Sequence, residues 1–423
     1  MGKTRKSPAH QNSKEAHDHV QLRGEIREEV LTQIDLSKEV NDEIIFDMID
    51  QAVLFKGRQT YISLEEKQQL RREIFNGIRR LDVLQELLEE DSVTEIMING
   101  PSDIFIEQEG KIHKWEKCFE NREKLEDVIQ QIVSKANRMV NESTPIVDVR
   151  LQDGSRVNVV LPPVAINGPI VTIRRFPKNP ITMEGLVEIG SLSREAADFL
   201  QKLVKARYNI FISGGTGAGK TTFLNALSGY IPSEERVITI EDSAELQIQG
   251  IPNLVRMEVR NANTEGKNTI DIRQLIRSAL RMRPDRIIVG EVRDAAAIDM
   301  IQAMNTGHDG SLSTGHANGP AEMLSRLETL VLMGMDIPLS AVRSQIASAV
   351  DIIVQLGRLR DKSRKTLSIS QVVGIEHGEI ICQPLYVFRE EEGGHGQRVV
   401  GDLVPTKHTL YRRKKLEAAG ICL

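Results

Sequence analysis

Residues 214–221 read GGTGAGKT and decide the fold of the second half of the chain. They match the pattern G-x-x-x-x-G-K-[ST] in full. An apolar run, NIFIS at 209–213, comes directly before them, and an amphipathic run, KTTFLNALSGYI, begins at 220. A strand, a glycine-rich loop and a helix in this order direct backbone N–H groups and the positive end of the helix toward phosphate. The sequence therefore predicts a nucleotide phosphate site.

Each residue type in this loop has a chemical role. Glycines let amides converge on phosphate oxygens, Lys220 places a charge between the β- and γ-phosphates, and the Thr221 hydroxyl is a ligand for Mg²⁺. The expected nucleotide-binding residues are Gly214, Gly215, Thr216, Gly217, Ala218, Gly219, Lys220, Thr221 and Thr222. The chain lacks an N-K-x-D element that would recognise guanine, which favours ATP with Mg²⁺ as the bound nucleotide.

Two acidic residues end apolar runs further along the chain, RVITIE at 236–241 and RIIVGE at 286–291. Open α/β sheets bind ligands at the carboxyl ends of their strands. We expect Glu291 to be the base that activates water, and Glu241 to support it at the Mg²⁺ ion, directly or through water. An isolated acid at a strand end is often only solvated, but the phosphate loop upstream favours the catalytic interpretation.

The glycine-rich segment NTGHDGSLSTGHANGP at 305–320 carries two histidines. It follows a helical pattern and would reach another strand end of the same sheet. We expect His316 to contact the γ-phosphate and so to respond to its loss. His308 is expected to order the loop.

The segments around these motifs indicate how the chain is organised. From 190 to 423, apolar β-branched runs alternate with helical patterns, which is typical of an α/β fold with a buried, mostly parallel sheet and helices on both faces. The last runs, starting with DIIVQLGRL at 351, predict an antiparallel meander. A linker is expected at 181–189, where Gly185 follows Pro177 and Pro180.

The first half of the chain has a different pattern. Alternating runs and the Asp153-Gly154 hairpin signal predict a small α+β domain at 91–180. Residues 23–90 predict a helical extension, which either packs on its own domain or docks a partner. The polar residues 1–22 predict a disordered tail.

Composition excludes several classes of protein. The formal net charge is −5 and aromatic residues make up 4% of the chain, so neither a basic field nor a stacking platform for nucleic acid is expected. No apolar stretch approaches the ~20 residues that span a bilayer, and the first residues lack the apolar core of a signal peptide. The three cysteines suit neither a disulfide framework nor a zinc site. We expect a cytoplasmic protein.

Taken together, the motifs resemble those of the type II/type IV secretion ATPase superfamily. The Walker A, Asp-box, Walker B and His-box sequences are matched by GGTGAGKTT (214–222), TIEDSAEL (239–246), RMRPDRIIVGEVRD (281–294) and TGHDGSLSTGHANG (306–319). SVTEIMINGPSDIFIEQEGKI (92–112), LQDGSRVNVVLPP (151–163) and TIRRF (172–176) resemble the amino-terminal domain of that superfamily. The resemblance covers roughly residues 80 to 423. The chain lacks a tetracysteine insertion and has a helical extension before the amino-terminal domain. In both respects it is most similar to the CpaF-like branch, which assembles Tad (Flp) pili.

The resemblance implies a RecA-like P-loop NTPase domain, a homohexameric ring and ATP held between the two domains of each subunit. Arg156, Arg174 and Arg175 would be the amino-terminal arginines that reach the phosphates, with Arg150 a weaker candidate. The implied partner is an inner-membrane pilus or secretion platform, so that the motor lies at the inner face of the cytoplasmic membrane and assembles, or also retracts, a pilus.

Alternative functions are a traffic ATPase of a conjugation-type or type II secretion or competence system, a nucleic-acid-stimulated RecA-like motor, and a regulatory nucleotide-binding protein. Two basic runs have no assigned role: RLRDKSRK at 358–365 and RRKK at 412–415. We interpret both as solvated faces, with contact to an acidic membrane partner or anionic lipid as the alternative.

Overall fold

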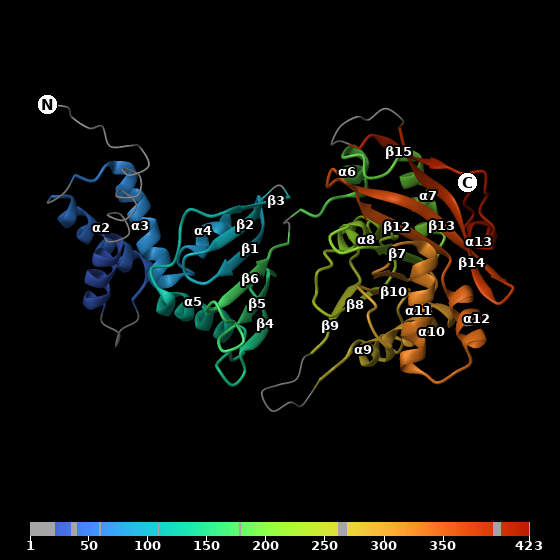
Figure 1. Cartoon of the computed structure of the whole chain (residues 1–423), viewed down its shortest axis with the longest axis horizontal. Coiled ribbons are helices and arrows are strands. Elements are labelled where there is room, and N and C mark those ends of the chain that lie inside the picture. The colour runs from blue at the N-terminus through green and yellow to red at the C-terminus, as the bar shows by residue number, and fades with distance from the viewer. Residues whose placement is uncertain are drawn as a thin grey trace. The chain divides into compact units, whose positions relative to one another are not determined.

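The computed structural model describes residues 22–34, 40–58, 61–108, 110–176, 179–260, 269–391 and 399–422. The chain divides into two compact units, Met1–Lys178 and Asn179–Leu423 (Figure 1). The tail predicted at 1–22 lies outside the described residues except for its last position. Within the described ranges, no helix is long and apolar enough to cross a membrane.

The first unit begins with a helical cluster that has its own core. It contains a helix at 22–33, α2 (Asp42–Gly57) and α3 (Leu64–Arg79). Ser63 accepts a hydrogen bond from the Glu66 amide and Glu66 returns one to the Ser63 amide, so the sequence-predicted capping box starts α3. Ile26, Ile49 and Leu70 pack together at the centre of this cluster. The described helices of the extension therefore pack on one another.

The α+β part of the first unit is an antiparallel sheet with helices on it. Its elements are α4 (Leu84–Glu89), β1 (Val93–Asn99), β2 (Ile104–Gln108), β3 (Lys111–Lys114), α5 (Arg122–Lys135), β4 (Ile146–Arg150), β5 (Arg156–Val160) and β6 (Ile170–Arg174). The strand order is β3-β2-β1-β6-β5-β4. Leu84 and Leu87 belong to the core of this sheet. The domain therefore starts near residue 81 rather than at 91, because α4 packs on the sheet and not on the helices before it.

The expected linker at 181–189 is a helix instead. Residues Met183–Glu188 form α6, which is capped by Thr182, and Met183 and Leu186 are buried in the core of the second unit. Pro180 precedes this short helix and Gly185 lies within it, so the second unit begins at Asn179 and not at 190.

The second unit is built on a nine-stranded sheet in the order β15-β14-β13-β12-β7-β11-β10-β8-β9. Its strands are β7 (Ile210–Gly214), β8 (Val237–Glu241), β9 (Leu254–Glu258), β10 (Arg286–Val289), β11 (Leu312–Gly315), β12 (Ile352–Arg358), β13 (Arg364–Glu376), β14 (Glu379–Glu390) and β15 (Gly401–Pro405). From β12 to β9 all neighbouring pairs are parallel, whereas β12 to β15 form the predicted antiparallel meander.

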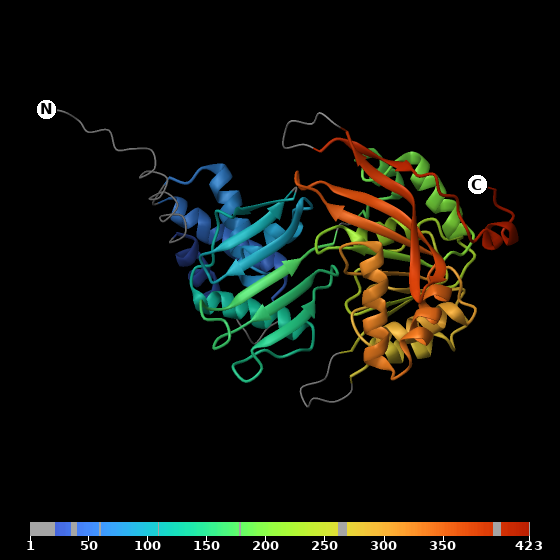
Figure 2. The same ribbon diagram turned by 45° about the vertical axis from the view of Figure 1, so that its right-hand side comes forward.

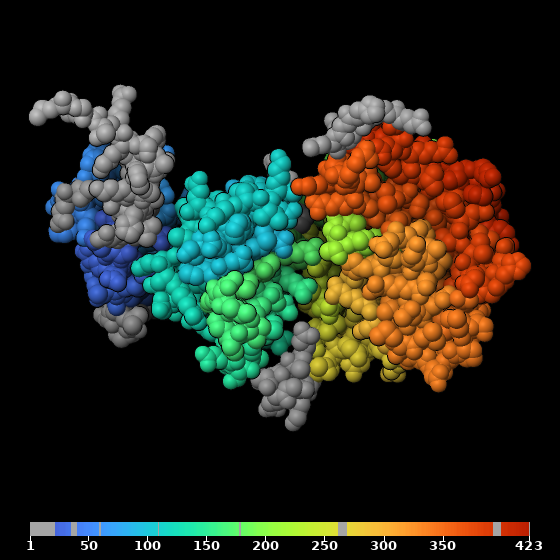
Figure 3. All heavy atoms as spheres, viewed as in Figure 1, coloured from blue at the N-terminus to red at the C-terminus, as the bar shows by residue number. Residues whose placement is uncertain are grey.

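Helices cover both faces of this sheet, as the sequence predicts (Figures 1 and 2). They are α7 (Arg194–Lys205), α8 (Lys220–Ser228), α9 (Ile272–Ala279), α10 (Ala296–Asn305), α11 (Pro320–Gly334), α12 (Leu339–Ala349) and α13 (Lys414–Ala418). Because side chains alternate along a strand, Ile210 and Ile212 of β7 pack in the core under α7 and α8. Phe211 packs in the core under α9 to α12. In the space-filling view, α10 to α12 and the C-terminal strands share one surface of this unit (Figure 3).

Candidate nucleotide site

The predicted phosphate loop lies between β7 and α8, at the carboxyl end of a central strand. Gly217 and Gly219 have φ angles of +73° and +91°, a region that favours glycine. A Cβ atom on Gly214 would lie 2.8 Å from the carbonyl oxygen of Leu356 on the adjacent strand β12. These glycines are therefore required by the backbone of the loop and by its close packing against β12.

Lys220 is the first residue of α8 and is 7% exposed. Its Nζ donates to the carbonyl oxygens of Gly214 and Gly215, both at 3.1 Å, and lies 3.2 Å from Nδ1 of His316. The ammonium group is thus held over the loop and aimed at β11. It sits where a loop lysine can meet the terminal phosphates of a nucleotide.

His316 and Glu291 continue this arrangement. Nε2 of His316 lies 3.1 Å from a carboxylate oxygen of Glu291, whose second oxygen accepts a hydrogen bond from Arg293 at 2.9 Å. Arg293 also lies 3.6 Å from Asp242. A histidine with its proton on Nε2 accepts from Lys220 and donates to Glu291 at the same time. The structure therefore joins Lys220, His316 and Glu291, which the sequence predicts separately, and adds Arg293, for which the sequence motifs predict no role.

The electrostatics of this group favour an ionised Glu291 and a neutral His316. Burial acts to raise the pKa of Glu291, but the hydrogen bond and charge of Arg293, with the charges of His316 and Lys220, outweigh burial and lower it. Burial and repulsion by Lys220 lower the pKa of His316. At neutral pH the site thus holds a carboxylate that can accept a proton and an imidazole that can donate a hydrogen bond.

Glu241 ends β8 and has a different environment. One carboxylate oxygen accepts from the amides of Glu245 at 2.6 Å and Leu246 at 2.8 Å, and the other is buried without a hydrogen-bond partner in the described structure. Burial raises the pKa of Glu241 to about 7, and the two amides only partly oppose this. A Cβ on Gly290 would lie 3.0 Å from the Cγ of Glu241, so Gly290 makes room for this carboxylate.

The donor set fits Mg²⁺. The Thr221 hydroxyl and the unpartnered oxygen of Glu241 are hard oxygen ligands of the kind that Mg²⁺ prefers. Burial of a carboxylate oxygen that has no partner is unfavourable unless a cation or a proton neutralises it. These two residues would hold the ion.

The second histidine and its glycines support the start of β11. Nδ1 of His308 lies 3.3 Å from the carbonyl oxygen of Ala303 in the last turn of α10, so this histidine joins the loop to the helix before it. A Cβ on Gly310 would lie 2.5 Å from a guanidinium nitrogen of Arg286. Arg286 is fully buried and pairs with Glu235. Gly310 therefore makes room for a buried ion pair at the end of the sheet opposite to the phosphate loop.

Three arginines lie side by side on the sheet of the first unit. Arg150 on β4 is directly opposite Arg156 on β5, and Arg156 is directly opposite Arg174 on β6. Opposed residues of antiparallel strands share a face, and like charges at these positions repel one another. Arg156 lies 3.6 Å from Asp148. This row is suited to bind an anion.

Arg175 behaves differently from this row. Its guanidinium group donates to backbone carbonyl oxygens at the end of α4 and the start of β1, including those of Leu88 at 2.8 Å and Val93 at 3.0 Å. Its side chain is 8% exposed. In this structure Arg175 joins α4 to the sheet and is engaged with carbonyl groups, unlike the phosphate contact expected from the sequence.

The interpretation of the basic runs as solvated faces holds for exposed side chains such as Arg360, Arg413 and Lys414, but not for Arg412 and Lys415. Arg412 and Lys415 pair with Asp351 at 3.0 and 2.7 Å, and Asp351 is only 3% exposed. Arg364 donates through Nε to the carbonyl oxygen of Gly217 in the phosphate loop, at 3.0 Å. Each of these contacts joins residues far apart in the sequence, so no local pattern could have predicted them.

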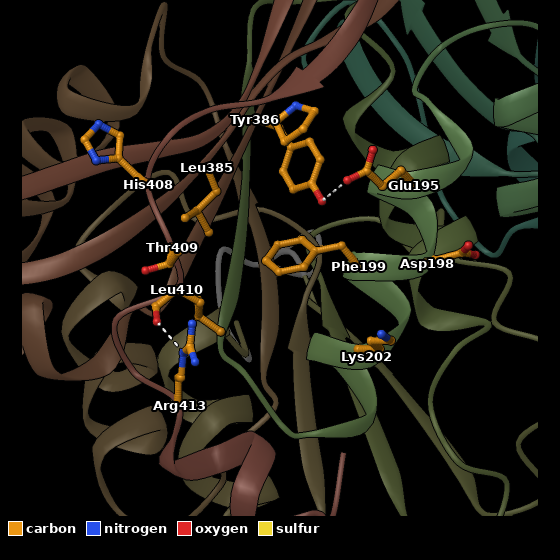
Figure 4. A pocket seen from close by; sticks show the side chains of 11 residues that line it. Glu195, Asp198, Phe199, Lys202, Leu385, Tyr386, His408, Thr409, Leu410 and Arg413 are labelled. Carbon is orange, nitrogen blue, oxygen red and sulfur yellow. Dashed lines mark hydrogen bonds between the residues drawn. The ribbon is translucent and has the colours of Figure 1, made fainter. Parts of the chain in front are cut away.

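A second pocket lies away from the phosphate loop, between α7 and the C-terminal segment (Figure 4). Its volume is about 480 Å³. The rings of Phe199 and Tyr386 meet there at 5.3 Å, and the Tyr386 hydroxyl donates to Glu195 at 3.4 Å. Acidic and basic side chains line it in a mixture, so its charge favours no single class of ligand.

Comparisons with known proteins agree on one family. Residues 79–410 match the family described as type II/IV secretion system protein. The conjugal transfer protein TrbB of Rhizobium radiobacter is 33% identical over 299 residues, which cover 70% of this chain and 87% of that protein. The type IV secretion system protein VirB11 of Bartonella quintana is 30% identical over 330 residues, covering 68% of this chain and 91% of that protein.

Among solved structures, the pilus retraction motor PilT with bound ADP is similar in fold, with a TM-score of 0.51 and 18% identity over 80% of this chain and 87% of that chain. The ATPase DotB of Legionella pneumophila has a TM-score of 0.50 and 22% identity, covering 70% of this chain and 80% of that chain. Both similarities concern the fold alone.

Proposed function

The chain is a P-loop ATPase of the type II/IV secretion system protein family, and on that premise we propose that it is a Mg²⁺-dependent motor that assembles a Tad/Flp-type pilus. The observation that carries the hydrolytic part is the contact chain from Lys220 through His316 to Glu291 at the carboxyl end of the sheet. The pilus itself is supported by the resemblance to the CpaF-like branch.

Within this proposal, each residue of the chain has a distinct task. Lys220 moves from the loop carbonyls to the β- and γ-phosphates when ATP enters. Glu291 holds the attacking water and accepts its proton, a role suited to an ionised carboxylate. His316 spans Lys220 and Glu291 and therefore responds when the γ-phosphate leaves. Mg²⁺, held by Thr221 and Glu241, would neutralise phosphate charge.

We further propose that the arginine row of the first unit completes the site in a homohexameric ring. Arg156 and Arg174 project from one face of the sheet, with Arg150 beside them. An arginine that stabilises the transition state of phosphoryl transfer contributes ~10³–10⁵ in rate. Hydrolysis would then depend on the first unit and on ring assembly.

The proposed partner is an inner-membrane platform protein, so the motor would act in the cytoplasm at the inner face of the membrane, without binding nucleic acid. A second candidate function is a traffic ATPase of a conjugation-type secretion channel, which the names of the relatives TrbB and VirB11 favour. Deletion of the gene separates the two candidates. Loss of surface pili supports the first, and loss of conjugal transfer with pili intact supports the second.

The experiment that tests the motor is a series of ATPase measurements at increasing protein concentration, with and without single-stranded DNA. Activity per subunit should rise with concentration and should not respond to DNA, because the sites are completed on assembly. A flat series that rises only when DNA is added would instead support a nucleic-acid motor. Tight ATP binding with negligible turnover at all concentrations would indicate a regulatory nucleotide-binding protein.

A further inference from the structure

A second cation contacts the phosphate loop besides Lys220 and comes from a distant part of the chain. Arg364 is the first residue of β13, and its Nε donates to the carbonyl oxygen of Gly217 at 3.0 Å. Its Cδ lies 3.5 Å from the position that a Cβ on Gly219 would take. The arginine therefore lies against the outer side of the loop, across the two glycines with positive φ.

The β12–β13 hairpin places Arg364 there. Leu356 of β12 is in register with Gly214 at the start of the loop, and Arg358 is directly opposite Arg364. The turn between the strands is held by its own hydrogen bonds. The Leu359 amide donates to Ser363 at 2.8 Å, and Asp361 accepts from the amide and hydroxyl of Ser363 at 3.0 and 2.6 Å. The backbone at Arg364 is thus fixed before any ligand binds.

The guanidinium group of Arg364 has donors left to use. The side chain is exposed, and in the described part of the chain its contact with Gly217 is its only hydrogen bond, with no carboxylate paired to it. Arg360 in the same hairpin differs, because it pairs with Glu390. A guanidinium group carries five N–H donors on a flat, weakly hydrated face. Arg364 therefore offers four donors and an open face beside the loop.

The order of strands fixes which end of a nucleotide Arg364 can reach. Lys220 is directed to His316, which directly follows β11 on one side of β7, and this contact marks the γ-phosphate end of the site. Arg364 comes from β13, beyond β12, on the other side of β7. A nucleotide whose γ-phosphate lies over β11 extends its α-phosphate, ribose and base toward β12 and β13.

We propose that Arg364 is a binding residue for the nucleoside end of ATP and ADP, with its guanidinium face stacked on the purine base while Nε stays bonded to Gly217. This inference rests on the proposed ATPase function and deepens it. A stacked cation contacts the π-face of the base and makes no hydrogen bonds to the groups on the edge of the base. It therefore accounts for nucleoside binding in a chain without an N-K-x-D element.

The test compares a ligand that has a nucleoside with one that does not. Binding of ADP and of pyrophosphate, each with Mg²⁺, is measured by calorimetry on the full chain and on the variants Arg364→Ala and Arg364→Lys. Loss of a cation–π stack should weaken ADP binding about 3- to 30-fold. Pyrophosphate binding should stay within about twofold of the parent. Lys should not fully restore ADP affinity, because it has no flat face to stack on the base. In turnover, the loss should fall on KM rather than on kcat.

Three results would overturn the inference. Equal weakening of ADP and pyrophosphate means that Arg364 only shapes the loop or touches phosphate. Full rescue by Arg364→Lys means that charge alone matters, and unchanged ADP affinity means that the arginine is a bystander. Arg360→Ala is the matched control, since it removes an arginine of the same hairpin that pairs with Glu390. Circular dichroism checks that each variant folds. Failure of the parent protein to bind either ligand would instead count against the ATPase proposal itself.

Discussion

Lys220 carries the first prediction at the scale of single residues. Its ammonium group is held by two loop carbonyls and aimed at His316, so no other described side chain can take its place at the terminal phosphates. Lys220→Ala should lower kcat at least ~100-fold, as expected when a preorganised charge is removed from a transition state. Steady-state phosphate release measures this, and substantial hydrolysis by the variant would falsify the assignment of the loop.

A second prediction distinguishes Glu291 from Glu241 as the catalytic base. Glu291→Gln removes the proton acceptor but keeps the shape of the side chain, so ATP binding should stay near that of the parent while kcat falls ~10²–10⁴-fold. Equilibrium binding and single-turnover hydrolysis are measured on the same sample. If Glu291→Gln hydrolyses ATP like the parent, then Glu241 becomes the candidate base, and Glu241→Gln is the variant to compare.

The raised pKa of Glu241 gives a third prediction, which concerns stability. The unfolded carboxyl ionises near its ordinary pKa of 4.5, whereas in the folded protein its pKa is about 7. Between these two values the folded state keeps a proton that the unfolded state has lost, so the free energy of unfolding falls as pH rises.

Above pH 7 this loss is complete and amounts to about 3 kcal/mol. Urea unfolding of the nucleotide-free protein at several pH values measures it, with Glu241→Gln as the reference that lacks the titrating group. Parent and variant curves that stay parallel from pH 4.5 to 7 would show that Glu241 ionises normally.

Residues of the site differ in how far the sequence predicts them. Gly214, Gly219 and Lys220 follow from a local pattern, since a phosphate loop needs its residues at fixed spacing. Arg293 and Arg364 have no such spacing. Arg293 is defined by the carboxylate that it orients, and Arg364 reaches the loop from a hairpin that begins far along the chain. Only the tertiary structure could identify these two.

At the scale of elements, helix α13 and the turn before it are held in place by two ion pairs to one buried carboxylate, which we call the clasp. Arg412 and Lys415 pair with Asp351, which also accepts a hydrogen bond from the Asn209 amide at 2.9 Å, directly before β7. Changing both cations, as Arg412→Met with Lys415→Met, leaves a buried carboxylate unpaired. The free energy of unfolding should fall by about 3 kcal/mol or more.

Urea unfolding measures this loss, and Lys414→Met in the same run is the matched control, since Lys414 is exposed. A double variant as stable as the control would mean that the clasp contributes nothing to the fold.

Elements also differ in how well the sequence predicts them. The parallel core strands and the meander were predicted because buried β-branched runs are distinctive. Pro and Gly in and around helix α6 predict a linker there, although Met183 and Leu186 are buried. Periodicity places helix α4 with the helices before it, because periodicity alone does not show which core a helix joins.

At the scale of the whole molecule, the arginine row predicts that the first unit is needed for turnover. Arg156→Ala combined with Arg174→Ala should reduce kcat ~10³-fold or more if the row supplies transition-state charge. Folding should be unaffected, because both side chains lie on the face opposite the buried valines of β5 and β6. Arg150→Ala measures the weaker candidate separately. Unchanged kcat in the double variant would show that the arginine row takes no part in catalysis.

The clasp has a further consequence for how this protein is made. Strand β7 carries the phosphate loop, yet its neighbours β11 and β12 and the cations beside Asn209 are translated long after it. A ribosome that stops before residue 415 releases a chain whose central strand lacks its last partners. Such a fragment exposes surface that proteases and chaperones recognise. Chains that stop before these partners are made should therefore be removed before they can enter an assembly and block it.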